Sequence, residues 1–114
     1  MRVLFDHCVP RPLRKRLLAD EIRTCVEEGW DDLDNGRLLA AAERRFDVFL
    51  TSDQNLVYQQ NLATRRIAIV VLPTNHLPTL LGLVSQIQQA LGEATPGAFL
   101  CVARPQGLWP QVAQ

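Results

Sequence analysis

The sequence predicts an α/β fold with a mainly parallel sheet of four or five strands, flanked by helices. Short apolar runs alternate along the chain with segments whose apolar residues repeat at helical spacing, which is the pattern of strands joined by crossover helices. The apolar runs are nearly continuous, as in DVFLT and IAIVVL, and this is typical of strands covered on both faces. A length of 114 residues fits one domain.

The strands are predicted from these runs and from the residues that end them. Asp6 ends the first run, RVLF, and Pro73 ends the clearest one, IAIVVL. Proline lacks an amide hydrogen, so it cannot continue a central strand. We expect the first strand to be central in the sheet. The predicted strands are residues 2–5, 22–25, 47–51, 67–72 and 98–102.

The first crossover is predicted to contain a helix that begins near Pro10 and Pro12, because proline is tolerated in a first helical turn. Val9, Leu13 and Leu17 repeat at four-residue spacing and would form its apolar face. The acidic stretch that follows the second strand, VEEGWDDL, is expected to be a turn-rich loop with at most one helical turn.

Three further helices are expected along the chain. Asn35 is a favourable N-cap for a helix over residues 36–45, and a short helix is predicted over residues 54–62. Pro78 opens a last helix that Gly92 ends. The apolar residues of this last helix recur at helical spacing and are Leu80, Leu81, Val84, Ile87 and Leu91.

The charged residues do not identify a class of partner. Twelve basic and twelve acidic residues cancel, so net charge does not indicate a nucleic-acid binder. Eleven of the twelve basic residues are arginine, which binds phosphate and carboxylate groups in a bidentate way. An ordinary set of surface arginines is the simpler explanation of this bias.

The cysteines and the start of the chain indicate a cellular compartment. Cys8, Cys25 and Cys101 are odd in number and form no C-x-x-C pair, so neither a disulfide framework nor a zinc site is predicted. The chain opens without the layout of a signal peptide, and no apolar run approaches the roughly 20 residues of a membrane span. We therefore expect a cytoplasmic, non-membrane protein. Residues 1–103 form the predicted domain, and residues 104–114 a Pro/Gly-rich tail.

Candidate chemistry lies where the predicted strands end, since open α/β sheets bind ligands beyond the carboxyl ends of their strands. Asp6 follows the first strand and Asp53 follows the third, and these strands are expected to be neighbours. Two carboxylates at one sheet edge can hold Mg²⁺ or Mn²⁺, and a metal held in this way activates water and neutralises the charge that develops on a phosphodiester. A turn or helix-capping role for each aspartate stays open.

The segment after Asp6 carries candidate substrate-binding residues. His7 is adjacent to Asp6, and Arg11, Arg14 and Lys15 lie on the basic side of the first predicted helix. These cations could steer phosphate groups toward the carboxylates. An ordinary loop histidine and a solvated helix face are the alternatives.

Two segments resemble the PIN-domain family. The stretch NGRLLAAAERRFDVFLTSDQNL resembles the family's pattern of a helix, a buried strand and a T-x-D motif, to which Thr51 and Asp53 correspond. The opening LFDHCVP resembles the first PIN strand with its aspartate, to which Asp6 corresponds. The pair is most similar to the short PIN-like branch related to VapC-type toxins, over residues 1 to about 90.

This resemblance implies a PIN-like three-layer fold and an endoribonuclease that depends on Mg²⁺ or Mn²⁺. Asp6 and Asp53 would bind the metal, Asn35 would position the metal or the attacking water, and Thr51 would orient Asp53. The resemblance also implies RNA as the substrate and a small antitoxin protein as a partner. Because toxins of this type commonly pair, and because the tail carries apolar residues, we expect a homodimer.

The chain departs from the family pattern at several acidic positions. Asn35 stands where the family usually has an aspartate, and Asn55 stands where a second acid often follows the T-x-D motif. The helical segment that normally carries a central glutamate is nearly absent, so its substitutes would be Glu27, Glu28, Asp31 and Asp32. The alternative function is therefore a catalytically weak or inactive PIN-like module that binds RNA or a partner protein.

A phospho-receiver domain is a third possibility, because it also needs acids after strands one and three. Such a domain has adjacent acids after strand one, where this chain has His7 after Asp6. It also needs a lysine after strand five, where this chain has Arg104. Both departures count against the receiver.

Overall fold

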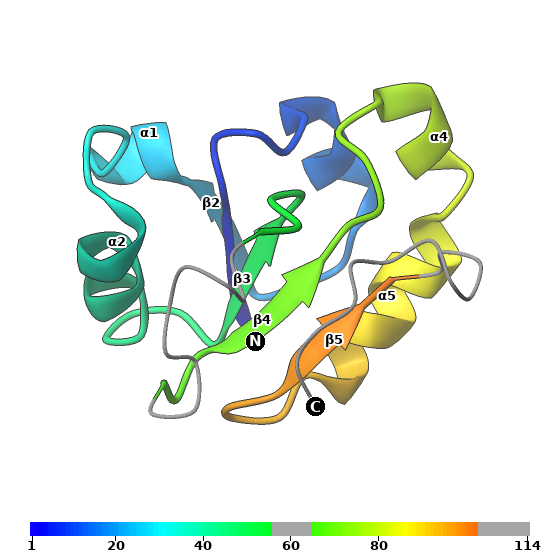
Figure 1. The fold of residues 1–114 in the computed structure, drawn as a ribbon. Helices are drawn as coiled ribbons and strands as arrows, with labels where there is room; N and C mark the ends of the chain where they lie inside the picture. Colours follow the sequence, from blue (N-terminus) through cyan, green and yellow to red (C-terminus); the bar gives the residue numbers. More distant parts are fainter. Residues whose placement is uncertain (56–64, 103–114) are drawn as a thin grey trace.

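A computed structural model describes residues 1–55 and 65–102, and it contains a five-stranded sheet in the order β2-β1-β3-β4-β5 (Figure 1). Every adjacent pair of strands runs parallel. This architecture confirms the predicted α/β fold and is consistent with a PIN-like three-layer arrangement. The strands are β1 (Arg2–Phe5), β2 (Glu21–Thr24), β3 (Val48–Thr51), β4 (Ala68–Val71) and β5 (Phe99–Cys101).

Helices cover both faces of the sheet, which gives the molecule three layers (Figure 1). One face is covered by α1 (Cys25–Glu28) and α2 (Asn35–Ala42). The other face is covered by the 3₁₀-helix η1 (Arg11–Arg16), α4 (Leu77–Leu81) and α5 (Val84–Glu93).

The sheet divides the core into two clusters, because neighbouring residues of a strand point to opposite faces. Phe5 and Leu50 pack into the cluster beneath η1, α4 and α5, whereas Leu4 and Phe49 pack into the cluster beneath α1 and α2. All four residues of β3 and all four of β4 are buried. Burial on both faces explains why the sequence of each of these strands is almost continuously apolar.

The helix predicted after Pro10 is a 3₁₀-helix and not an α-helix. The Leu13 amide donates to the Pro10 carbonyl, and the Leu17 amide donates to the Arg14 carbonyl, which are bonds between residues three apart. Pro12 has no amide hydrogen to donate within this segment. The predicted apolar face is confirmed, since Val9, Leu13 and Leu17 are all buried.

The acidic stretch after β2 contains the single turn α1. Thr24 and Glu27 form a reciprocal capping box at its start, in which each side chain accepts from the other residue's backbone amide. Gly29 ends the turn with a φ of 76°, a left-handed conformation that glycine adopts at little cost. The expected single helical turn is therefore present.

The start of α2 corrects the prediction that Asn35 is the N-cap. Asp34 is the cap: its backbone is extended, and its carboxylate accepts from the Arg37 amide at 2.9 Å. Asn35 is the first helical residue. Both side chains are favourable caps, but only one residue can take the non-helical backbone of that position. The helix ends at Ala42 and not at Arg45, since residues 43–45 form turns.

The last predicted helix is divided into α4 and α5. The Gly82 amide donates to the Thr79 carbonyl and the Leu83 amide to the Leu80 carbonyl, which tightens the chain between the two helices. Glycine costs about 1 kcal/mol relative to alanine inside a helix, which favours a break there. At the other end, α5 continues through Gly92 to Glu93.

The strand order corrects the expectation that β1 is central. β1 is an interior strand between β2 and β3, and β3 is in the middle because β4 and β5 both add on its far side. The predicted helix over residues 54–62 falls mostly outside the described residues, as does the predicted tail. In the described ranges no helix has the length and apolar character needed to span a membrane.

Candidate active site at the carboxyl edge of the sheet

The carboxyl ends of β1 and β3 meet at the point where the order of the strands reverses. The chain passes from β1 to β2 on one side and then places β3 on the other side of β1. In open parallel sheets such a switch point leaves a crevice in which ligands bind. The register pairs Phe5 with Leu50, so Asp6 and Asp53 follow neighbouring strands at the same sheet edge.

Asp6 is buried at this edge, with 5% of the residue exposed. Its Oδ2 accepts from the Thr51 hydroxyl at 2.7 Å and from the Cys8 thiol at 3.5 Å. Its Oδ1 accepts from the His7 amide at 2.8 Å and lies 3.0 Å from the ring nitrogen Nδ1 of His7. These contacts offset the cost of removing the carboxylate from water, which is several kcal/mol for an unpaired charge.

Thr51 links the two aspartates. Its hydroxyl donates to Asp6 and accepts from the Asp53 backbone amide at 3.0 Å. The Asp53 carboxylate in turn accepts from the Asn55 amide at 2.9 Å, which holds the turn after β3. Thr51 therefore orients the backbone of Asp53, and the direct partner of its hydroxyl proton is Asp6.

Two cysteines that the sequence did not single out lie beside Asp6. The Cys8 sulfur accepts from the Ser52 amide at 3.5 Å and is 3.7 Å from the Thr51 hydroxyl oxygen. Burial, and then the charge of Asp6, raise the pKa of the Cys25 thiol to about 12. Cys25 therefore stays protonated at neutral pH. Their positions in the sequence could have indicated this placement, because Cys8 is two residues past Asp6 and Cys25 directly follows β2.

The candidate substrate-binding cations differ in their surroundings. Arg11 and Lys15 are exposed on η1. Arg14 instead donates to the Glu27 carboxylate at 2.7 Å and to the Ile22 carbonyl at 3.4 Å, so its charge is partly neutralised. His7 is exposed and belongs directly to the Asp6 cluster.

The acids proposed as substitutes for a family glutamate are engaged elsewhere. The Glu28 side chain is only 2% exposed and pairs with both Arg23 and Arg45. Glu27 forms the capping box and pairs with Arg14, and these contacts lower the pKa of its carboxyl, the Thr24 amide most of all. Both glutamates therefore serve to join β2, α1 and their neighbours.

The predicted site residues are thus only partly assembled. The contacts described above join Asp6, His7, Thr51 and Asp53 at one sheet edge. Asn35 is half-buried on a different element, the first turn of α2. Asp31 and Asp32 are exposed in the loop between α1 and α2.

A hard cation fits the chemistry of this donor set. Mg²⁺ is usually held by one or two carboxylates together with waters and substrate phosphates, and Asp6 and Asp53 supply two carboxylates at one edge. Within the described parts of the chain, no three His, Cys, Asp or Glu side chains gather as a metal-holding group. A cation here would therefore depend on Asp6 and Asp53 and on oxygen atoms of water and substrate.

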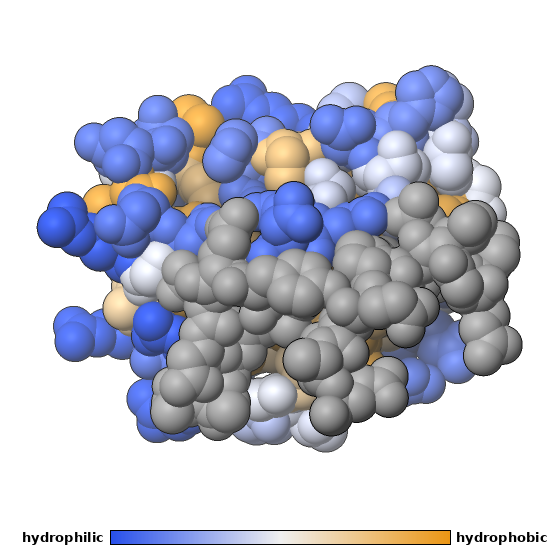
Figure 2. All heavy atoms as spheres, in the orientation of Figure 1, coloured by the Kyte–Doolittle hydropathy of each residue, from blue (hydrophilic) through white to orange (hydrophobic). Residues whose placement is uncertain are grey.

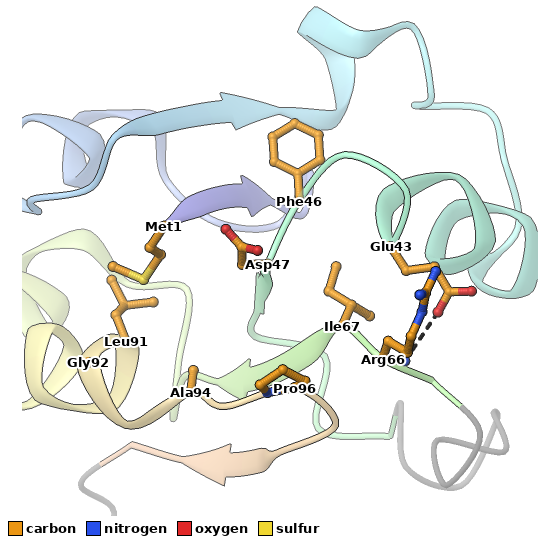
Figure 3. Close-up of a pocket in the computed structure, with 10 residues that line it drawn as sticks. All are labelled: Met1, Glu43, Phe46, Asp47, Arg66, Ile67, Leu91, Gly92, Ala94 and Pro96. Carbon is orange, nitrogen blue, oxygen red and sulfur yellow. Dashed lines mark hydrogen bonds between the residues drawn. The ribbon is translucent and has the colours of Figure 1, made fainter.

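A cavity of about 530 Å³ lies at the opposite, amino edge of the sheet (Figure 3). Phe46 and Ile67 contribute to its apolar lining, and Glu43, Asp47 and Arg66 contribute charge. Its two acids already bind the backbone. Asp47 accepts from the Arg2 amide at 2.8 Å, and Glu43 accepts from the Arg66 amide at 3.3 Å.

Comparisons of the chain with family models, curated proteins and solved structures gave no match. The choice between the two edges rests on their geometry and chemistry.

Proposed function

We propose that this chain is a ribonuclease of the PIN-like toxin type that hydrolyses RNA phosphodiesters with Mg²⁺ or Mn²⁺. One observation carries the proposal: Asp6 is a buried carboxylate held by Thr51 at the switch point of a parallel sheet, and Asp53 follows the neighbouring strand. The site lies where ligands bind in open α/β sheets.

In this proposal Asp6 and Asp53 hold the cation, and the Thr51 hydroxyl fixes the position of both residues. The bound cation would activate water and neutralise the charge that develops on the phosphodiester. Arg11 and Lys15, exposed on the helix that follows Asp6, would bind flanking phosphates of the RNA. Arg14 contributes less because it is paired with Glu27.

The test is cleavage of a labelled single-stranded RNA by the full chain, with Mn²⁺ and with a chelator. Asp53→Asn should lower the rate by roughly a hundredfold or more, because the cation loses a charged ligand. Asp47→Asn removes an equivalent charge at the amino edge and should leave the rate unchanged. Equal rates for all three proteins, or full activity in chelator, would exclude this mechanism.

Asn35→Asp tests whether the site is weakened because this chain has asparagine at a position where the PIN-domain family usually has aspartate. A third carboxylate should tighten Mn²⁺ binding and raise cleavage if α2 brings residue 35 within reach of the cation. The measurement is calorimetric Mn²⁺ titration of both proteins. If neither protein binds Mn²⁺, the nuclease proposal is wrong, and the alternative of a non-catalytic binding module takes its place.

The alternative is a catalytically weak or inactive module that binds RNA or an antitoxin protein. It is favoured by the engagement of Glu27 and Glu28 in structural ion pairs, which leaves few acids for a metal. RNA binding that persists in chelator, without cleavage, is the result expected of such a module.

A cytoplasmic homodimer that an antitoxin neutralises remains part of the proposal. On the face seen in Figure 2, hydrophobic residues of the described chain form small patches among hydrophilic ones. Light scattering at micromolar concentration, alone and with the product of a neighbouring short reading frame, would test both forms of association.

A further inference from the structure

The two oxygens of the Asp6 carboxylate face different surroundings. Oδ2 is held by the buried Thr51 hydroxyl and by the thiol of the half-buried Cys8. Oδ1 accepts from the His7 backbone amide, and the ring nitrogen Nδ1 of His7 lies 3.0 Å away. Oδ2 therefore faces the fully buried Thr51 of β3, whereas the contacts of Oδ1 come from the exposed residue His7.

The His7 ring lies beside Oδ1 of Asp6. The Asp6 side chain is 6% exposed, whereas the His7 side chain is 68% exposed, with its Nδ1 only 3.0 Å from Asp6 Oδ1. Among the partners of Asp6 described above, the ring is the one exposed side chain. It can move away from Asp6 by rotation about its own side-chain bonds. The His7 amide, the Thr51 hydroxyl and the Cys8 thiol stay with the folded backbone or its buried surroundings.

We propose that the His7 ring competes with the metal ion for Asp6 Oδ1, so that metal binding requires the ring to swing out. This inference rests on the proposed function, because it assumes that Asp6 is a metal ligand. Mg²⁺ binds oxygen at roughly 2.0–2.1 Å. A cation at that distance from Oδ1 would compete for space with the ring, whose Nδ1 lies 3.0 Å from the same oxygen. His7 is then a positioning residue whose ring lies against the carboxylate when no cation is bound.

The ring contact is expected to lower the affinity of the site for a metal ion. A cation that can bind only the conformation in which His7 has moved away binds with an affinity reduced by the population of that conformation. Removing the ring should therefore strengthen metal binding. A merely structural role of His7 would give the opposite sign, because disordering the Asp6 carboxylate would weaken binding.

The test is calorimetric Mn²⁺ titration of the full chain, comparing wild type with His7→Ala and His76→Ala. His76 is a matched control, since it is also exposed and its Nδ1 lies 2.9 Å from the hydroxyl of Thr79, in the segment after β4. The Mn²⁺ association constant should rise roughly two- to tenfold in His7→Ala, the range expected for removing one competing polar contact, and stay constant in His76→Ala.

The outcomes separate this inference from the proposed function. Mn²⁺ binding that is unchanged or weaker in His7→Ala, with binding intact in wild type, overturns the competition and leaves the metal site standing. No binding by any of the three proteins overturns both. Binding by His7→Ala alone supports both. Thermal unfolding of each variant checks the fold, and the exposure of both histidines predicts little change.

Discussion

At the carboxyl edge of the sheet Asp6 is buried and accepts from Thr51, Cys8 and His7, whereas at the amino edge Asp47 is exposed and accepts from the backbone amide of Arg2. The amino edge has the cavity of about 530 Å³, and the carboxyl edge has the buried polar cluster. A cavity and a buried polar cluster therefore lie at opposite edges of the same sheet. Burial of an organised charge is the more specific mark of function, because it costs free energy that a surface charge does not.

The largest effect on stability is expected from Asp6→Ala. The change leaves the buried Thr51 hydroxyl and the partly buried His7 amide without their acceptor. We expect the free energy of unfolding to fall by about 3 kcal/mol, since each unsatisfied buried group costs about 1–3 kcal/mol. Asp47→Ala, at the exposed amino edge, should lose about 1 kcal/mol or less. Urea unfolding measures both, and equal losses would remove the contrast between the edges.

Glu28→Gln comes next and separates structural acids from candidate catalytic ones. The Glu28 carboxylate is nearly fully buried between Arg23 and Arg45, both of which remain partly exposed. Losing its charge should lower the free energy of unfolding by roughly 1–2 kcal/mol, because hydrogen bonds to charged groups weaken. Mn²⁺ affinity, measured by calorimetry, should not change. A fall in Mn²⁺ affinity would instead indicate that Glu28 is a metal ligand.

A smaller effect should appear in the pH dependence of stability through Glu27. The Thr24 amide and Arg14 hold the pKa of Glu27 below its unfolded value near 4.5. A group whose pKa is lowered by folding stabilises the protein above its unfolded pKa, and this contribution disappears as the pH falls through the folded value. The difference in stability between wild type and Glu27→Gln should therefore shrink below pH 4.5, from a value under about 1 kcal/mol at pH 7.

Urea unfolding of both proteins from pH 7 to pH 3 measures the Glu27 effect. A difference that stays constant across this range, or grows as the pH falls, would contradict the assignment of the lowered pKa to the folded state.

The smallest effect on stability is expected at the other candidate ligand, through Asp53→Asn. Asp53 is half-buried, and an asparagine can still accept from the Asn55 amide. The free energy of unfolding should stay within about 0.5 kcal/mol of wild type, as for most partly exposed substitutions. Mn²⁺ affinity should nevertheless fall. Substitutions at Asp6 and Asp53 would then differ sharply in their effect on the free energy of unfolding, while both would lower the affinity for Mn²⁺.

Much of the fold could be predicted because the strongest sequence patterns were local. The run RVLF followed by Asp6 predicted a buried strand with a carboxylate at its end, and the four-residue spacing from Val9 to Leu17 predicted a buried face. The errors fall where two local solutions compete. Asp34 and Asn35 are both good caps, and at Gly82 the apolar spacing favours a continuous helix whereas the glycine favours a break.

The composition of the site was less predictable because its contacts join distant parts of the chain. Thr51 was expected to orient Asp53, and its hydroxyl does accept from the Asp53 amide, but its proton goes to Asp6, 45 residues away. Cys8 had no predicted role and lies against both Asp6 and Thr51. Glu27 and Glu28 were possible ligands until their arginine partners were located.

The α/β class, the buried strands and the placement of Asp6 and Asp53 after strand ends could all be inferred from local patterns, since periodicity and strand-ending residues act over a few positions along the chain. Three features came only from the three-dimensional arrangement: β3 is the middle strand, the Glu28 side chain is a buried ion-pair partner, and the His7 ring lies 3.0 Å from Asp6. The physical reason is that strand order, burial of charge and the pairing of hydrogen bonds depend on which distant residues become neighbours, and local patterns carry little information about that choice.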